Sequence, residues 1–266
     1  MYCLHRRLAV ARVPGTLVYY KDLCPNDNYC DVIKGYLLNI FIMNRRRSFL
    51  WVLTLMATMA FTTGQKKKVI FFGDSITAAG AKPGGYILKV GELAAKDTMA
   101  DRYEFVGAGI GGNKVYDLYL RMERDVLSKK PDVVIIFVGV NDVWHKRSHG
   151  TGTDADKFEK FYAALMARMQ EQQIQVVLVT PAAIGERTDF SNELDGDLNN
   201  YSKIIRQLAK KNNLPLVDLR QRFLEYNMKH NTENKESGIL TSDKVHLNEM
   251  GNEFVAKEMW EVIKSL

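Results

Sequence analysis

From residue 66 to the C-terminus, short apolar runs alternate with longer segments in which apolar residues recur at helical spacing. The apolar runs lie at residues 69–72, 104–107, 133–138, 176–180 and 214–218. The run at 133–138 has six apolar residues in succession, which is typical of a strand covered on both faces. The helical segments lie at about residues 86–97, 115–127, 156–172, 194–212 and 248–265, with one more helix ending near 229. This alternation predicts an α/β fold, with helices on both faces of a parallel sheet.

The segment before this pattern has the layout of a secretory signal peptide. Met43 is followed by three arginines, an apolar run at 49–61, and small residues before a cleavage point at Gln65. The apolar run is shorter than the roughly 20 residues that cross a bilayer comfortably. We therefore predict a signal peptide at 43–64 and a secreted or periplasmic protein without a stable membrane anchor after cleavage. An uncleaved anchor is the alternative.

Residues 1–42 have no clear periodicity and precede a segment that should itself be N-terminal. We interpret them as a non-native extension, with translation beginning at Met43 and one domain at 65–266. Of the net charge of +6, residues 1–64 carry +5 and the remainder +1, so the main body offers no basic surface for nucleic acid. All three cysteines lie before residue 31, which excludes a disulfide or a cysteine nucleophile from the main body.

Ligands of open parallel sheets bind beyond the carboxyl ends of the strands, so chemistry is expected just after each apolar run. The first run is followed by Gly73, Asp74 and Ser75. A serine on the turn that leaves a buried strand could be a nucleophile, and the start of the next helix would supply backbone N–H groups for an anionic intermediate. The alternative is that Asp74 and Ser75 only cap a helix.

Two further segments offer hydrogen-bond donors at the same edge. The second run leads into a glycine-rich stretch, where the N–H of Gly112 could reach a reacting oxygen. This stretch lacks the Gly-Lys-Ser/Thr ending that a phosphate loop requires, so it is not read as one. The alternative is that it forms only a tight turn between strand and helix. The third run leads into Asn141 and Asp142, and the Asn141 amide could donate to an oxyanion. A simple Asn-Asp turn is the alternative there.

A base for the serine lies near the C-terminus. Asp243 precedes His246 by three residues in one loop, so its carboxylate could fix the tautomer of the ring and stabilise its charged form. His145 and His149 have metal-ligand spacing if they are helical. No acidic residue lies between them and their neighbours are solvated types, so no metal site is expected.

Taken together, these segments resemble the conserved blocks of the SGNH hydrolases, also called the GDSL esterase/lipase family. The match is carried by Gly73-Asp74-Ser75, Gly112, Gly139-Val140-Asn141-Asp142 and Asp243-Lys244-Val245-His246, in the same order and after successive strands. Two positions depart from the usual pattern: Ile76 replaces a commoner leucine, and Lys244 stands where glycine is frequent.

The resemblance implies a three-layer α/β/α sandwich with a flavodoxin-like, five-stranded parallel sheet. It implies that Ser75 is the nucleophile, His246 the base and Asp243 the residue that orients it. The N–H groups of Ser75 and Gly112 and the Asn141 side chain would form the oxyanion hole. No metal or organic cofactor is implied.

The substrate is less sharply indicated. The loops at 144–153 and 182–193 are polar, and we find no long apolar insertion that could cover a lipid. With Trp144 as a sugar-stacking platform, we expect a short acyl ester, an acetyl group, on a carbohydrate or other small molecule. A lysophospholipase or thioesterase of the same family is the alternative. From another class, an inactive carbohydrate-binding protein would have an incomplete site. The α/β-hydrolase motif Gly-x-Ser-x-Gly does not fit, because Thr77 replaces the last glycine.

Overall fold

The computed structural model describes residues 9–13, 16–19 and 65–266, and the chain divides into two compact units, Met1–Gly64 and Gln65–Leu266. In the first unit, β1 (Ala9–Val13) and β2 (Thr16–Tyr19) form an antiparallel hairpin that the sequence pattern did not predict. The predicted signal peptide at 43–64 and the start at Met43 lie outside the described residues. Within the described ranges, no helix combines the length and apolar content needed to cross a bilayer.

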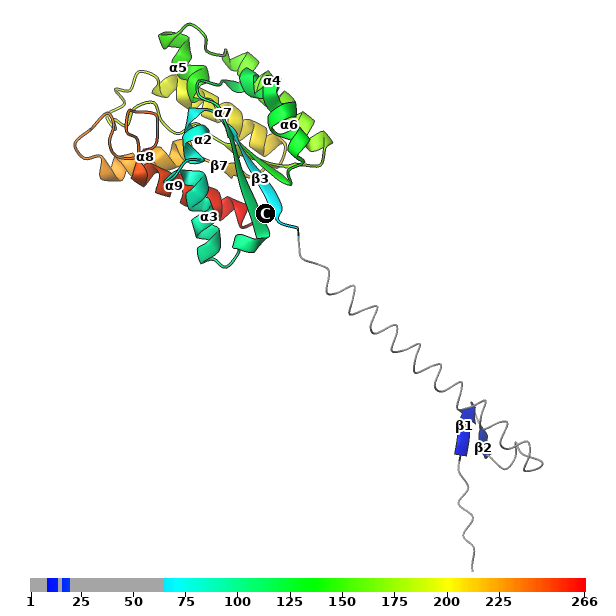
Figure 1. Ribbon diagram of the computed structural model, residues 1–266. Coiled ribbons are helices and arrows are strands. Elements are labelled where there is room, and N and C mark those ends of the chain that lie inside the picture. Colours follow the sequence, from blue (N-terminus) through cyan, green and yellow to red (C-terminus); the bar gives the residue numbers. More distant parts are fainter. Residues whose placement is uncertain (1–8, 14–15, 20–64) are drawn as a thin grey trace, which may run out of the picture. The chain divides into compact units, whose positions relative to one another are not determined.

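The second unit is built on one parallel sheet of five strands in the order β4-β3-β5-β6-β7 (Figure 1). Its strands are β3 (Lys67–Gly73), β4 (Tyr103–Gly109), β5 (Val133–Phe137), β6 (Gln175–Val179) and β7 (Leu216–Val217). The first strand of the sheet in sequence lies second in space, which is the flavodoxin-like order. The predicted fold class is therefore confirmed, although β7 keeps only two of the five residues expected at 214–218.

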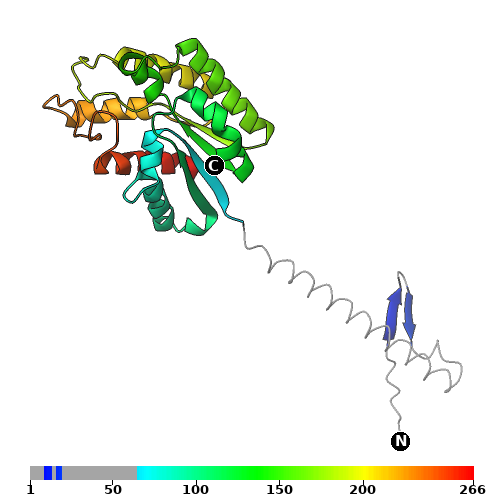
Figure 2. The ribbon, with the colours of Figure 1, turned by 45° about the horizontal axis from the view of Figure 1, so that its top comes forward.

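Helices cover both faces of this sheet (Figures 1 and 2). One face is covered by α3 (Tyr86–Lys96), α8 (Leu219–His230) and α9 (Glu249–Ile263). The other is covered by α4 (Val115–Asp125), α6 (Ala155–Glu171) and α7 (Asp195–Lys211). Two short helices, α2 (Ser75–Gly80) and α5 (Val140–Ser148), begin just beyond the carboxyl ends of β3 and β5. Single turns of 3₁₀ helix lie at Ala100–Arg102 and Leu127–Lys129.

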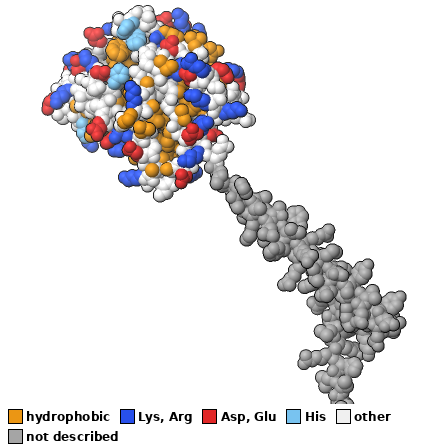
Figure 3. All heavy atoms as spheres, viewed as in Figure 1, with side chains coloured by type: hydrophobic (Ala, Val, Ile, Leu, Met, Phe, Trp, Pro, Cys, Tyr) orange, Lys and Arg blue, Asp and Glu red, His pale blue; other side chains and the backbone are white. Residues whose placement is uncertain are grey.

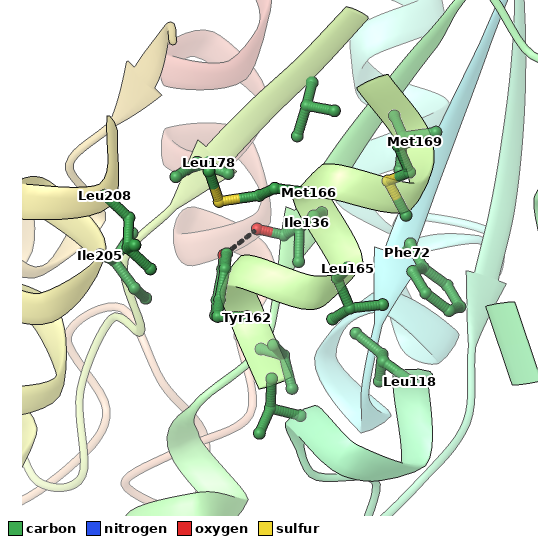
Figure 4. Close-up of a cluster of buried hydrophobic side chains, with 14 of the residues drawn as sticks. Phe72, Leu118, Ile136, Tyr162, Leu165, Met166, Met169, Leu178, Ile205 and Leu208 are labelled. Atoms are coloured by element: carbon green, nitrogen blue, oxygen red, sulfur yellow. Dashed lines mark hydrogen bonds between the residues drawn. The ribbon is translucent and has the colours of Figure 1, made fainter. Parts of the chain in front are cut away.

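Alternate strand residues enter two separate cores, as a pleated sheet requires. On the α6 side, Tyr162 and Met166 pack with Phe72 and Ile136 (Figure 4). The Tyr162 hydroxyl donates to the Ile136 carbonyl at 3.1 Å, so this buried polar group is satisfied without leaving the core. On the α9 side, the neighbouring strand residue Phe71 packs with its ring edge-on to that of Tyr86, with centroids 5.7 Å apart.

The last helix of the chain docks against an early one. The backbone N–H of Tyr86, the first residue of α3, donates to the Asn252 side chain of α9 at 2.9 Å. An N–H at a helix start has no partner within its own helix, so Asn252 satisfies a group that would otherwise be orphaned. Farther along α9, the Trp260 indole donates to Asp97 beyond the end of α3 at 2.7 Å. The C-terminal helix is thus tied to α3 at both ends.

The register brings the strand ends to one level. Gly73 at the end of β3 pairs with Gly109 of β4 and Phe137 of β5, and Val179 of β6 pairs with Phe137 and Val217. Segments that are far apart in sequence therefore leave the sheet side by side at its carboxyl edge. Figure 3 shows basic and acidic side chains interspersed over the visible face of this unit, in keeping with its near-neutral charge.

One element was misjudged from the sequence. The segment after the third strand was interpreted as a turn or polar loop, whereas α5 begins directly at Val140. Its first turn, Val140–Val143, is buried and only its last three residues are exposed, but the buried turn includes Asn141 and Asp142, so the helix carries no continuous apolar signal. Gly139 precedes it with a φ of 136°, a conformation open to glycine, and this sharp exit from β5 allows a helix to start at once.

Candidate active site

Ser75 is the first residue of α2, two residues after β3 ends. The preceding Asp74 is buried, and its carboxylate accepts the N–H of Ile76 at 3.0 Å as a helix N-cap. Because the N–H of Ser75 lies in the first helical turn, it has no acceptor within α2 and is available to a ligand. The helix-capping interpretation and the nucleophile interpretation are thus compatible, since Asp74 caps and Ser75 is half-buried beside it.

The structure brings His246 and Asp243 together with Ser75. His246 Nε2 lies 2.9 Å from Ser75 Oγ, across 171 positions of sequence. The other ring nitrogen, Nδ1, lies 2.7 Å from Asp243 Oδ2. Asp243 Oδ1 accepts the backbone N–H groups of His246 at 2.7 Å and Val245 at 3.1 Å. These contacts link hydroxyl, imidazole and carboxylate in one chain, which is the arrangement that activates a serine.

The Asp243 carboxylate is held in its charged form. Partial burial acts to raise its pKa, but the hydrogen bonds from the backbone and ring of His246 outweigh burial, and the net result is a pKa below the ordinary value. A charged carboxylate at Nδ1 directs the free lone pair of the neutral ring toward Ser75. Lys244, between the two residues, has a φ of 83°. This left-handed conformation explains why glycine is frequent at this position of the family.

The glycine-rich loop passes close to Ser75. A Cβ built on Gly111 would lie 3.9 Å from Ser75 Cβ, and Gly112 has a φ of 75°, which favours glycine. The buried Asn141 side chain donates one N–H to the backbone oxygen of Asn113 at 3.1 Å. Its amide has a second N–H that remains for a ligand. The loop of residues 111–113 thus lies next to both Ser75 and Asn141, and the roles of Ser75, Gly112 and Asn141 as oxyanion donors remain a prediction.

Arg121 of α4 was missed by the sequence analysis, yet it underlies this loop. Its guanidinium donates to the carbonyls of Gly73 at 2.7 Å and Ala108 at 3.1 Å, and to the Asn113 side chain at 2.7 Å. It also lies 4.5 Å from the centroid of the Phe72 ring. One cation therefore joins the ends of two strands to the loop that follows Gly112. The sequence contained one indication that Arg121 is buried, because it lies three residues after Leu118 and therefore on the same face of the helix.

Asp142 connects the third conserved block to the second. Its buried carboxylate accepts the N–H of Val115, the first residue of α4, at 3.1 and 3.3 Å. Burial raises the pKa of Asp142 to about 6, and it raises the pKa of Asp74 to about 7. Backbone N–H groups act in the opposite direction at both residues. The site thus contains two buried carboxylates whose ionisation is penalised.

A further acidic residue, Glu186, was also missed. It lies after β6 with an exposed fraction of 1%, and its carboxylate accepts three successive backbone N–H groups of residues 239–241. These residues precede Asp243 and His246. A single glutamate in a polar loop carries no sequence signal that would distinguish it from a solvated one.

Trp144 and His145 of α5 and His149, the residue that caps its C-terminus, have different surroundings. Trp144 is half-buried and packs against both cores, so its role in substrate binding remains a prediction. His145 lies beside Gly112, because a Cβ built there would be 3.8 Å from the ring carbon Cε1. The rings of His145 and His149 are 4.5 Å apart, and Figure 3 shows histidine side chains where α5 lies. Within the described ranges, no three side chains are grouped to hold a metal ion.

With this geometry established, comparison with known proteins identifies the family. A model of the GDSL-like lipase/acylhydrolase family matches residues 71–254, which contain all the site residues described above. The chain belongs to this family. It is therefore a carboxylic ester hydrolase, and the family resemblance seen in the sequence is confirmed.

Several relatives of this GDSL-like hydrolase have named activities. An acetylxylan esterase of Geobacillus stearothermophilus is 31% identical over 181 residues, covering 61% of this chain and 80% of that enzyme. The crystal structure of the acetyl xylan esterase AlAXEase is 66% identical, covers 74% of this chain and 99% of that one, and has a TM-score of 0.73. The structure of a catalytic mutant of Axe2, an acetylxylan esterase from Geobacillus stearothermophilus, is 25% identical over 76% of this chain and 96% of that one, with a TM-score of 0.66.

Proposed function

We propose that this GDSL-like hydrolase is a secreted acetyl esterase that removes acetyl groups from carbohydrates, with Ser75, His246 and Asp243 as its catalytic triad. The observation that carries the proposal is the unbroken contact chain from Ser75 Oγ through the His246 ring to Asp243. The similar acetylxylan esterases support the choice of substrate.

The relatives also support the choice of residues. Three solved structures of Axe2 are described as catalytic mutants, in which a serine, an aspartate and a histidine are each replaced by alanine. The aspartate and histidine are three positions apart, as Asp243 and His246 are here. The same three residue types with the same interval favour the same division of roles in this chain.

The mechanism follows from the geometry. His246 Nε2 takes the proton of Ser75 as Oγ attacks the acetyl carbonyl carbon, and the C=O electron pair moves onto oxygen. The backbone N–H groups of Ser75 and Gly112 and the free N–H of Asn141 stabilise that oxyanion. The intermediate then expels the sugar oxygen, which takes the proton from His246. Water, deprotonated by His246, attacks the acetyl-enzyme, and acetate leaves as Ser75 regains its proton.

The test is hydrolysis of p-nitrophenyl esters of increasing acyl length and release of acetate from acetylated xylan. We expect the acetyl ester to be turned over fastest, and Ser75→Ala to lower kcat by about a thousandfold or more. Ser128→Ala, which replaces an exposed serine in the 3₁₀ turn after α4, should behave as wild type. Rates that rise with acyl length would favour the lysophospholipase or thioesterase alternative. Activity that survives Ser75→Ala would reject the triad.

The export proposal needs a separate test, because it concerns residues 43–64. We expect the exported protein to begin at Gln65, and the unprocessed product to begin at Met43. N-terminal sequencing of both forms checks this. A peptide from residues 1–42 in the unprocessed product would contradict the proposed start.

A further inference from the structure

The segment that leads into Asp243 and His246 is held by one buried carboxylate. Glu186 Oε1 accepts the N–H groups of Leu240 at 2.7 Å and Thr241 at 3.1 Å, and Oε2 accepts that of Ile239 at 2.9 Å. Three amide dipoles therefore point at a carboxylate that is almost entirely removed from solvent. Hydrogen bonds to a charged acceptor are shorter and stronger than neutral ones, and the low dielectric of a buried site strengthens them further.

The carbonyl groups of the same segment are held from the other side. The Asn248 side-chain amide donates to Ile239 O at 3.2 Å and to Thr241 O at 3.4 Å, while its backbone N–H donates to Leu240 O at 3.0 Å. Asn248 is itself fixed, because its side-chain oxygen caps α9 by accepting the N–H of Gly251 at 2.9 Å. Every N–H and C=O of the three residues therefore has a partner, and the segment has one well-defined position.

That position is passed on to the triad. The N–H of Ser242 donates to His246 O at 2.8 Å, so residues 242–246 form a tight loop that closes on the held segment. The tip of this loop is tied to the residue before Glu186, because the Gly185 N–H donates to Lys244 O at 2.9 Å. Two adjacent residues after β6 thus fix both the base and the tip of the loop that carries Asp243.

We propose that Glu186 is a positioning residue for catalysis, whose buried carboxylate fixes the loop of Asp243 and His246 so that the imidazole meets Ser75. This inference rests on the proposed triad. Glu186 contacts neither Ser75 nor the His246 ring in this arrangement, and it acts only through the backbone of residues 239–241. A misplacement of about 1 Å in a catalytic group costs on the order of a hundredfold in rate, which sets the effect expected from this residue.

The test compares three variants of the full chain. Glu186→Gln keeps the size of the side chain but presents an NH₂ group to backbone donors that need an acceptor. Glu186→Asp keeps the charge but shortens the reach by one methylene. Trp260→Phe is the control, because it removes a buried hydrogen bond to Asp97 at the opposite end of α9. The readouts are kcat, KM and the rate at which a fluorophosphonate modifies Ser75, which reports the nucleophile without a sugar-binding step.

We expect Glu186→Gln to lower kcat and the phosphonylation rate together by about ten- to a hundredfold, with KM changed by less than about threefold, since the loss lies in proton transfer. Glu186→Asp should lie between it and wild type. Trp260→Phe should lower thermal stability and leave both rates unchanged. In proton NMR, the Nδ1–H signal of His246, which reports its contact with Asp243, should shift or broaden in Glu186→Gln and stay unchanged in Trp260→Phe.

Wild-type kcat and phosphonylation in Glu186→Gln would overturn the inference while leaving the triad intact. If Glu186→Gln does not fold, Glu186→Asp decides the question, and wild-type rates in that variant would overturn the inference. A loss of rate in Trp260→Phe equal to that in Glu186→Gln would show that lowered stability, not positioning, is the cause. Turnover that persists in Ser75→Ala would instead refute the proposed triad, whatever Glu186 does.

Discussion

The two halves of the site are held by buried side chains of opposite charge. Around Ser75, the Arg121 guanidinium binds the carbonyls of Gly73 and Ala108. Around His246, the Glu186 carboxylate binds the N–H groups of residues 239–241. The nucleophile side is braced from within the core, by a helix that packs on the sheet. The base side is braced by one loop against another.

The difference follows from the polarity of the backbone. Near the ends of β3 and β4, the carbonyls of Gly73 and Ala108 need donors, and a buried cation with several N–H groups satisfies both at once. A loop that turns its N–H groups inward needs an acceptor instead, and a carboxylate supplies two oxygens with several lone pairs. The sign of a buried anchoring charge is therefore set by which backbone groups it must satisfy.

The sharpest way to test this comparison is to remove the cation. Arg121→Met should lower the free energy of unfolding by about 3–5 kcal/mol, because it takes a buried donor from the carbonyls of Gly73 and Ala108 and removes one of the two arginines that bind Asp125. Urea denaturation measures this loss. The matched control is Arg124→Met, since Arg124 binds the same aspartate but is 74% exposed. It should lose far less stability, because solvent screens an exposed ion pair. Equal losses in the two variants would refute the bracing role of Arg121.

The next prediction concerns the side-chain amide of Asn141, which lies in the same half of the site as Ser75. Asn141→Ala should lower kcat by about a hundredfold or more, because one oxyanion donor is lost, with KM little changed. Steady-state kinetics on the acetyl ester measures it. Asn212→Ala is the control, because Asn212 also donates its side-chain amide to a backbone carbonyl, that of Leu208, but in α7. If both variants keep the wild-type kcat, Asn141 is not an oxyanion donor.

The change that is most gradual with conditions is a pH dependence of stability. Because burial raises the pKa of Asp74 from 3.8 to about 7, the folded protein keeps a proton that the unfolded chain releases in that range. This contribution is fully present below pH 4 and is lost as the pH rises toward 7, with a slope of up to about 1.4 kcal/mol per pH unit. Asp74→Asn, whose side-chain oxygen can still cap Ile76, should flatten the slope. Urea denaturation across this pH range measures it, and an unchanged slope would contradict the assignment.

Much of the site could be predicted because its residues follow strands directly. The continuous apolar run of β5 and the register of its neighbours fix where Ser75 and Asn141 emerge, within a residue or two. The pairing of Asp243 with His246 is local in sequence and needs no knowledge of the fold. The contact between His246 and Ser75, which are 171 positions apart, could be expected only from the family resemblance and from strand order.

The supporting residues could not be predicted in the same way. Arg121 lies on a helix with four other charged residues, two of them exposed, and a cation gives no sign that its acceptors are strand-end carbonyls. Glu186 depends on the conformation of two loops, which local sequence patterns do not specify. The helix α5 was missed because its buried first turn contains Asn141 and Asp142 and its last residues are charged or polar, so neither a buried nor an amphipathic pattern dominates.

The docking of α9 on α3 affects the order of events during synthesis. Ser75 enters the sheet with the first strand of the domain, whereas His246 and the Asn252 cap of Tyr86 come from the end of the chain. These long-range contacts carry a large loop-closure cost and form only once the whole domain has been translated. A growing chain therefore holds its serine without a base until the last helix packs. The appearance of hydrolysis then reports completion of the polypeptide.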